Sequence, residues 1–356
     1  MSHFAPHFRI LAEQVEFFLQ NGYVVIKQAF TREKAAEWMK SMWIRLGVDP
    51  NDKATWTEER VHMPVQSRQA VSTFAPKVNH QYDIGRSLKL TVYGYKAWEA
   101  IKELLGGEER IDEQASTWGD SFIVNFGTPE CEGAPSPDPK DLTNWHVDGD
   151  FFVHFLDSPE QALLVIPLYT DIKPRGGGTY LCPEGIEWTA KYLASHPEGV
   201  RPVKCAFVSS TSSAADPKED PSYFSHCEQV QNATHFVETT GEIGDVVLMH
   251  PLMYHSASMN YLREARVITN PPVALREPFK FARDDPEEYS LVELKTLKAL
   301  GVDRFECKPT TERRLIVPER VLIQQKMLEE ERKRLEAMKE NGNSAIAQSP
   351  APIAVA

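Results

Sequence analysis

The sequence NWHVDGD, residues 144–150, carries the most informative pattern in this chain, a His-x-Asp pair formed by His146 and Asp148. In an extended segment, residues two apart point to the same side, so this imidazole and this carboxylate can face one metal ion. A lone His-x-Asp pair is usually a surface or core feature without a metal. The pair therefore becomes informative only with a third ligand from elsewhere in the chain.

A third ligand is available in GDVVLMHPLMYH, residues 244–255, which contains His250 and His255. Either imidazole would complete two histidines and one carboxylate, the set that holds Fe(II) in non-haem oxygenases and leaves other positions of the ion open. A 2-oxo acid and O2 need those open positions. On one regular strand, residues five apart face opposite sides, so only one of the two histidines is expected in the site.

Arg266 lies eleven positions after His255. The His-x-Asp pair, the later histidine and this arginine together resemble the phytanoyl-CoA dioxygenase family of Fe(II)/2-oxoglutarate-dependent oxygenases, and the chain looks like a fungal-type member. The resemblance covers residues 10–275, and FFLQNGYVVIKQAF, residues 17–30, is similar to the start of that family. Eleven positions is the family's interval between the third ligand and the arginine. The resemblance therefore implies His146, Asp148 and His255 as metal ligands, and His250 as a buried histidine with local partners.

The resemblance also implies a mainly β chain with flanking helices (α+β), built on a double-stranded β-helix, which is a jelly-roll or cupin-like barrel with iron inside one mouth. Helical periodicity predicts helices over residues 9–20, from an N-cap at Thr31 to Leu46, and over 97–105, with a strand at 23–26. Strands are predicted at residues 121–126, 151–155, 162–169, 179–182, 207–210, 245–250 and 267–269. Short strands at this spacing favour a sandwich or barrel.

Arg266 lies in ARVIT, residues 265–269, an apolar run that predicts a buried strand. A buried charge without a partner is costly, and a guanidinium holds a carboxylate through two parallel hydrogen bonds. The resemblance implies that the distal carboxylate of 2-oxoglutarate is this partner. Thr179 and Asn125 are weaker candidates for co-substrate contacts, and a threonine satisfied within its own strand explains Thr179 equally well. Ala257 stands where many family members carry a hydroxyl residue, so that contact is missing.

The length of 356 residues fits one large domain. We expect a single oxygenase domain over residues 1–310, a charged C-terminal helix over 311–340 and a disordered tail over 341–356. Residues 78–95 look foreign to the family pattern, which suggests an insertion or a gene-model artefact. The five cysteines are far apart and lack the paired spacing of a zinc site or a redox motif, so we expect free thiols.

The net charge of -12, from 51 acidic and 39 basic residues, argues against general binding to nucleic acid or anionic membranes. The N-terminus contains Arg9, Glu13 and Glu16 among its apolar residues and so lacks the apolar segment of a signal peptide or membrane span. We expect a cytoplasmic protein that acts on a small molecule. The C-terminal helix is most simply a solvated helix; a partner-binding helix, which would allow a homo-oligomer, is the alternative.

The predicted activity is a dioxygenase that uses Fe(II), 2-oxoglutarate and O2 to oxidise a small organic substrate, by default through hydroxylation, with release of succinate and CO2. Asp150, Phe151, Phe152 and His154 are candidates to line the substrate pocket, although phenylalanines at strand spacing are more often core residues. Two alternatives stay open. One is a metal-dependent hydrolase that uses the same ligands, and the other is an inactive barrel that binds a partner.

Overall fold

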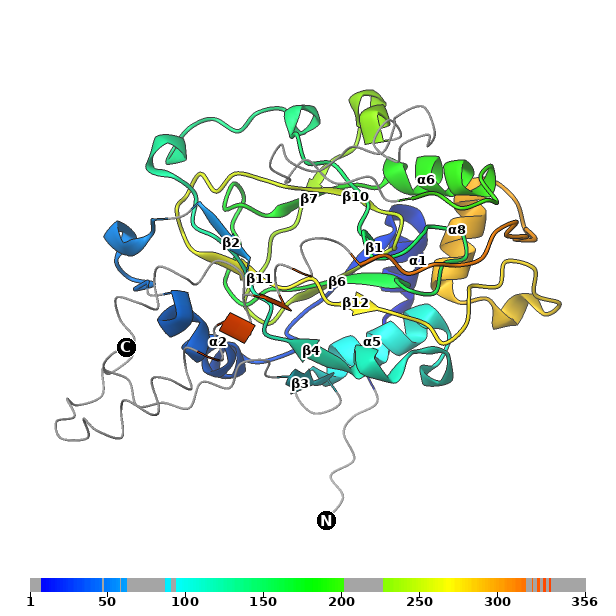
Figure 1. Cartoon of the computed structure of the whole chain (residues 1–356), viewed down its shortest axis with the longest axis horizontal. Coiled ribbons are helices and arrows are strands. Elements are labelled where there is room, and N and C mark those ends of the chain that lie inside the picture. Colours follow the sequence, from blue (N-terminus) through cyan, green and yellow to red (C-terminus); the bar gives the residue numbers. More distant parts are fainter. Residues whose placement is uncertain are drawn as a thin grey trace, which may run out of the picture.

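Five complete α-helices lie in the part of the chain that this computed structural model describes, which comprises residues 8–46, 48–57, 59–62, 87–90, 94–201 and 227–317 and single positions between 322 and 333. They are α1 (Ala12–Asn21), α2 (Arg32–Leu46), α5 (Tyr95–Leu105), α6 (Glu184–Ala194) and α8 (Leu291–Leu300). Helix α8 contacts α1, α5 and α6. Figure 1 shows these four helices gathered at one end of the sheets, with α2 near the other end.

The strands of the described residues form antiparallel sheets. They are β1 (Tyr23–Ile26), β2 (Arg60–His62), β3 (Ser87–Lys89), β4 (Thr117–Gly119), β5 (Ile123–Asn125), β6 (Leu163–Pro167), β7 (Thr179–Cys182), β8 (Val237–Glu238), β9 (Val246–Met249), β10 (Tyr254–Ala257), β11 (Arg266–Ile268) and β12 (Pro272–Val273). The sheet orders are β1-β9-β6-β12, β10-β7-β8, β11-β5-β2 and β3-β4. The chain is therefore a mixed α/β fold with antiparallel sheets.

The centre of the largest sheet is buried on both faces. Every residue of β6 (LLVIP) and β9 (VVLM) is buried, which explains why these strands read as continuous apolar runs without alternation. Helix α1 enters this sheet through Gly22, whose positive φ of 74° ends the helix and turns the chain into β1. A Cβ at Gly22 would lie 2.1 Å from Cδ1 of Ile186 on α6, so the close approach also requires glycine.

Most predicted elements are confirmed. Helices α1, α2 and α5 and strand β1 lie where periodicity places them, and the hydroxyl of Thr31 accepts a hydrogen bond from the backbone of Lys34 at 3.2 Å, as an N-cap does. The predicted strand over residues 151–155 is wrong, because that segment makes only isolated bridges, from Phe152 to Leu315 and from His154 to Val200. The predicted strand over 207–210 lies outside the described residues.

Two helices and six strands of the described residues escaped the sequence patterns, namely α6, α8, β2, β3, β4, β8, β10 and β12. Helix α8 carries a recognisable start signal, because Ser290 and Glu293 form a reciprocal capping box. Strand β10 is harder to find, because YHSA has no alternation of apolar and polar residues and its first three residues are buried.

The structure describes only part of two segments, residues 78–95 and the C-terminal residues 311–356. Within residues 78–95, Ser87–Lys89 forms β3 and pairs with β4, and Leu90 is fully buried. Whether 78–95 is an insertion stays a prediction. The predicted C-terminal helix does not begin at residue 311, because residues 311–317 are not helical, although single described positions between 322 and 333 are helical. The predicted tail, 341–356, lies outside the described residues.

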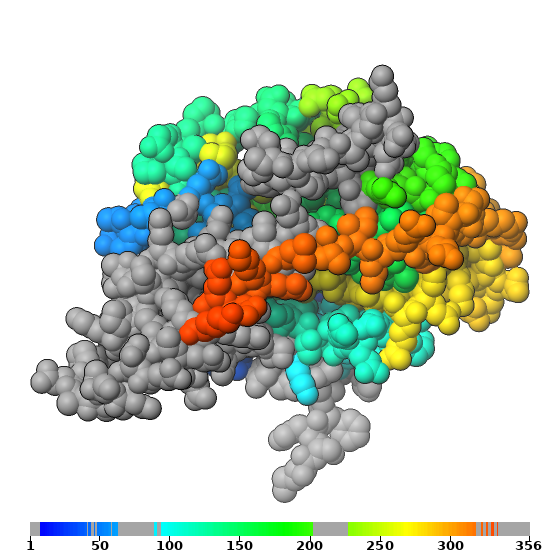
Figure 2. Space-filling view, viewed as in Figure 1, coloured from blue at the N-terminus to red at the C-terminus, as the bar shows by residue number. Residues whose placement is uncertain are grey.

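The segment that leads to residue 317 (orange in Figure 2) crosses one face of the molecule. It is held by backbone hydrogen bonds from Val153 to the carbonyl of Arg314 (2.9 Å) and from Ile316 to the carbonyl of Phe151 (2.7 Å). None of the helices in the described ranges is both long and apolar enough to cross a lipid bilayer.

Candidate metal centre

His146 and His255 lie directly opposite each other in an antiparallel bridge. Each backbone N–H donates to the carbonyl of the other residue at 3.0 Å. Residues paired in this way project their side chains to the same face, and the two ring centroids are 4.2 Å apart. Strand β10 thus supplies one histidine and the His-x-Asp segment the other, so the backbone pairing itself brings together residues more than a hundred positions apart.

The hydrogen bonds of the two rings fix which nitrogen faces Asp148. Nδ1 of His146 lies 2.7 Å from the carbonyl of Asn144, and Nδ1 of His255 lies 3.0 Å from the carbonyl of Met253. A carbonyl oxygen only accepts hydrogen bonds, so Nδ1 carries the proton in both rings. A neutral ring with this tautomer presents an unprotonated Nε2, the form in which histidine binds a metal, whereas a ring that is also protonated at Nε2 donates to Asp148 instead.

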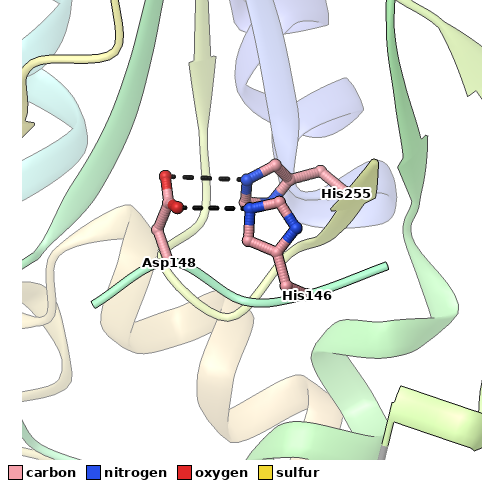
Figure 3. A group of neighbouring side chains, drawn as sticks. All are labelled: His146, Asp148 and His255. Carbon is pink, nitrogen blue, oxygen red and sulfur yellow. Dashed lines mark ion pairs between the residues drawn. The ribbon is translucent and has the colours of Figure 1, made fainter. Parts of the chain in front are cut away.

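The two Nε2 atoms and the carboxylate of Asp148 converge, as Figure 3 shows. His146 Nε2 lies 3.4 Å from Oδ1 and His255 Nε2 lies 3.6 Å from Oδ2. One ion bound at about 2.1 Å from each donor requires donors no more than about 4.2 Å apart. Both distances satisfy that limit, and one ligand atom from each residue lies within 4.8 Å of the others. The group can hold a metal ion.

The charges at this group suit a cation. Burial lowers the pKa of His146, but the hydrogen bond and charge of Asp148 outweigh burial, and the pKa lies above its usual value. Burial raises the pKa of Asp148, but the charge of His255 and hydrogen bonds from both histidines hold it well below its usual range. Asp148 is therefore ionised at neutral pH, as a metal-binding carboxylate must be.

His250 is not part of this group. It lies in the turn between β9 and β10, so the argument that it shares a regular strand with His255 was wrong. Its Nε2 lies 2.9 Å from the hydroxyl of Thr296, and its Nδ1 accepts a hydrogen bond from the backbone of Leu252 at 3.2 Å. Burial lowers the pKa of His250 to about 3. It is a neutral, fully buried histidine with local partners.

Arg266 and Arg60 share one face of the sheet β11-β5-β2. Both are register partners of Asn125, and directly paired residues project to the same side. Arg266 is 2% exposed; its Nε donates to the carbonyl of Gly177 at 2.8 Å, and no described carboxylate pairs with it. Burial, and next the charge of Arg60, lower the pKa of Arg266 to about 9. Among the described residues, the one carboxylate paired with these two cations is Glu59, 3.9 Å from Arg60.

Arg60 escaped the sequence analysis, because a strand of three residues gives no pattern that marks it. Its Nη2 donates to the carbonyl of Ser258 at 3.2 Å, and its buried Nε has no hydrogen-bond partner. Its described ion pair is a long contact of 3.9 Å with the half-exposed Glu59. Arg60 therefore retains capacity for an anion.

Thr179 and Asn125 differ in what their side chains leave free. Asn125 donates from Nδ2 to the carbonyl of Ser258 (3.0 Å) and accepts from the backbone of Gly127 (3.1 Å), which leaves one N–H. Thr179 is the register partner of Ala257, two residues from His255 in β10, so Thr179 and His255 share a face. The hydroxyl of Thr179 makes no hydrogen bond to a described residue. Thr179 lies opposite Ala257, the position where many members of the similar family carry a hydroxyl.

Gly149 follows Asp148 with a φ of +117°, and a Cβ there would lie 2.6 Å from His154 and 2.7 Å from Phe152. We expect Gly149→Ala to lower the free energy of unfolding by about 1–3 kcal/mol and to displace Asp148, because it adds backbone strain and a clash. The control is Gly133→Ala, which has a φ of +77° but open space around the Cβ. Urea unfolding and Co(II) titration would test this; unchanged metal affinity in Gly149→Ala would refute the displacement of Asp148.

Comparisons with known proteins give solved structures only. No family model matches the chain, and no curated protein matches it. The carbocyclase SnoK from nogalamycin biosynthesis, described as non-heme and alpha ketoglutarate dependent, is 13% identical with a TM-score of 0.38, over 86% of this chain and 97% of that chain. HygX from Streptomyces hygroscopicus, with nickel and 2-oxoglutarate bound, is 11% identical with a TM-score of 0.38, over 77% and 90%. EctD from S. alaskensis is 15% identical with a TM-score of 0.36, over 77% and 79%. These TM-scores lie below 0.5, so the similarities alone do not decide fold or function.

Proposed function

We propose that this chain is a non-haem Fe(II)- and 2-oxoglutarate-dependent dioxygenase that oxidises a small organic substrate, by default through hydroxylation. The observation that carries this proposal is the coexistence of two sites in one fold of antiparallel sheets. His146, Asp148 and His255 converge on one point with metal-binding tautomers, and Arg266 is a buried cation that lacks a described carboxylate partner. Two histidines and one carboxylate leave positions of the ion open, as Fe(II) oxygenases require.

Each residue has a defined part in this proposal. His146, Asp148 and His255 hold the iron, and Arg266 binds the distal carboxylate of 2-oxoglutarate with the N–H groups that the carbonyls of Gly177 and Ile123 do not use. Arg60 adds positive charge on the same face. The hydroxyl of Thr179 takes the place of the hydroxyl absent at Ala257, and the free N–H of Asn125 is a further donor. When bound, iron supplies the activation of O2 that couples oxidation of the substrate to release of succinate and CO2.

We also propose that the sheets form a double-stranded β-helix within a single domain over residues 1–310. The support is that consecutive strands alternate between sheets. The chain passes from β6 in the largest sheet to β7 and β8 in the second, back to β9, and again to β10. The resemblance to the phytanoyl-CoA dioxygenase family predicts this architecture. The charged C-terminal helix, and the homo-oligomer that it would allow, stay predictions.

A metal-dependent hydrolase would use the same three ligands to activate water. Nothing in that reaction requires buried cations such as Arg266 and Arg60. The two functions differ in their need for O2 and 2-oxoglutarate, so they can be separated by experiment.

The test is succinate formation from 2-oxoglutarate by the full chain, measured with a panel of amino acids and small metabolites. We expect succinate only when Fe(II) and O2 are both present, and we expect it to increase with a true substrate. Product formation from a panel compound under anaerobic conditions would support the hydrolase. Absence of turnover with every compound and every divalent metal would support a binding protein.

A further inference from the structure

His154 is a buried histidine that lies close to the metal centre but is not one of its three converging ligands. It is 3% exposed, and its Nε2 lies 2.6 Å from the carbonyl oxygen of Gly149, the residue that follows Asp148. A carbonyl oxygen only accepts hydrogen bonds, so Nε2 of His154 carries a proton and donates it. Burial lowers the pKa of His154 to about 4, so the ring is neutral at physiological pH. This hydrogen bond closes a loop over residues 149–154 beside the metal centre.

The donor ring is itself held in place by its surroundings. It stacks on the ring of Phe152, with the two centroids 4.2 Å apart and the planes 25° from parallel. The backbone of His154 exchanges two hydrogen bonds of 2.8 Å with Val200, and the neighbouring Val153 N–H donates to the carbonyl of Arg314 at 2.9 Å. A side chain that is fixed by packing and by its backbone holds its hydrogen-bond donor in one place.

Gly149 fits against this ring with no room for a side chain. Gly149 is buried, and a Cβ there would lie 2.6 Å from Cε1 of His154. The imidazole therefore packs against the backbone of Gly149 and also binds its carbonyl oxygen. Because Gly149 is the next residue after Asp148, a shift of the Gly149 peptide would carry the Asp148 carboxylate with it. His154 can thus act on a metal ligand through the backbone of Gly149.

We propose that His154 is a positioning residue of the metal centre, which holds the Asp148 carboxylate where the Nε2 atoms of His146 and His255 converge. A ligand that is fixed before the metal arrives does not have to be ordered on binding, which increases the affinity. Partners of metal ligands commonly have this function. The identification of the metal as the iron of an oxygenase rests on the proposed function, whereas the positioning of Asp148 does not.

The test uses two substitutions that separate the hydrogen bond of His154 from its packing. His154→Phe keeps a ring that can stack on Phe152 but has no donor, whereas His154→Gln keeps an N–H donor on a side chain of similar reach. Co(II) titration of the full chain, without 2-oxoglutarate or O2, measures metal affinity. We expect His154→Phe to weaken Co(II) binding by about 10–100-fold. His154→Gln should stay within about fivefold of wild type, because the hydrogen bond is retained.

The matched control is His250→Phe, the same substitution at a fully buried histidine outside the metal centre. Urea unfolding of each metal-free variant measures its stability. His250→Phe should lower the stability but keep Co(II) affinity within about twofold of wild type, because all three donors remain in place. If His154→Phe does not fold, His154→Leu provides a second variant that lacks the donor.

The visible spectrum of bound Co(II) adds a measurement that a loss of stability alone does not change. We expect the spectrum of His154→Phe to differ from that of wild type, since a displaced Asp148 alters the coordination, and the spectrum of His154→Gln to match wild type. Wild-type affinity in both donorless variants, or equal losses in the Gln and Phe variants, would overturn the proposal. A wild-type chain that binds Co(II) but forms no succinate with Fe(II) would contradict the proposed function and leave this inference intact.

Discussion

Replacing His255 with alanine is expected to reduce metal affinity by more than about 100-fold, because removing a direct ligand costs more than losing the outer-shell partners of a metal site. His255 provides one of three converging donors, and its Nδ1 is fixed by the carbonyl of Met253 so that Nε2 faces Asp148. Succinate formation should disappear with the metal. Co(II) titration followed by visible absorption would measure the affinity directly, and the coupled formation of succinate would measure turnover.

The matched control is His250→Ala, five positions away in the same segment. His250 is fully buried and is bonded to Thr296 and to the backbone of Leu252. Its loss should lower the free energy of unfolding by about 1–3 kcal/mol, since it leaves a buried hydroxyl and N–H with fewer partners. Metal affinity should stay within about twofold of wild type, because His250→Ala leaves all three donors, from His146, Asp148 and His255, in place. If His250→Ala loses the metal and His255→Ala retains it, the assignment of the third ligand is wrong.

The fold was predictable where local physics dominates. Continuous apolar runs predict buried strands such as β6 and β9, and the N-cap at Thr31 predicts the start of α2. Residues 151–155 look like a strand for the same reason, yet they make only isolated bridges, and Phe152 and Phe155 are buried without joining a sheet. An apolar sequence predicts that a segment is buried. It does not predict which element packs against that segment, because this depends on the tertiary structure.

The candidate site shows the same division. The pattern around residues 144–150 identifies His146 and Asp148 as potential ligands, and the structure brings them to His255 through a backbone bridge that no sequence pattern displays. The sequence spacing of eleven positions to Arg266 selected His255 over His250. The argument that both histidines lie on one regular strand was wrong, because a turn separates β9 from β10. Arg60 escaped notice because its significance lies in a buried Nε that has no hydrogen-bond partner. Such an absence is visible only after folding.

Replacing Arg266 with glutamine is expected to weaken binding of 2-oxoglutarate by about 10–150-fold, which corresponds to hydrogen bonds with a charged group worth about 1.5–3 kcal/mol. Arg266 is 2% exposed; its Nε donates to the carbonyl of Gly177, and its Nη1 donates to the carbonyl of Ile123 at 3.5 Å. The remaining N–H groups form the planar donor pair that suits a carboxylate. Arg266→Lys should recover part of the affinity, because it keeps the charge without the paired donors. Calorimetric titration of the Mn(II)-loaded chain measures each affinity.

The decisive control is a second ligand, 2-oxopentanoate, which has the same 2-oxo acid end but a methyl group in place of the distal carboxylate. If Arg266 contacts that carboxylate, Arg266→Gln should weaken 2-oxoglutarate alone and make the two ligands nearly equal. Arg60→Gln should produce a smaller change in the same direction, since Arg60 shares the face but is already bonded to Ser258 and lies near Glu59. A structural role for Arg266, through its hydrogen bond to Gly177, would instead weaken both ligands by the same factor. That outcome would remove the carboxylate anchor from the proposed function and would leave only the metal site to support it.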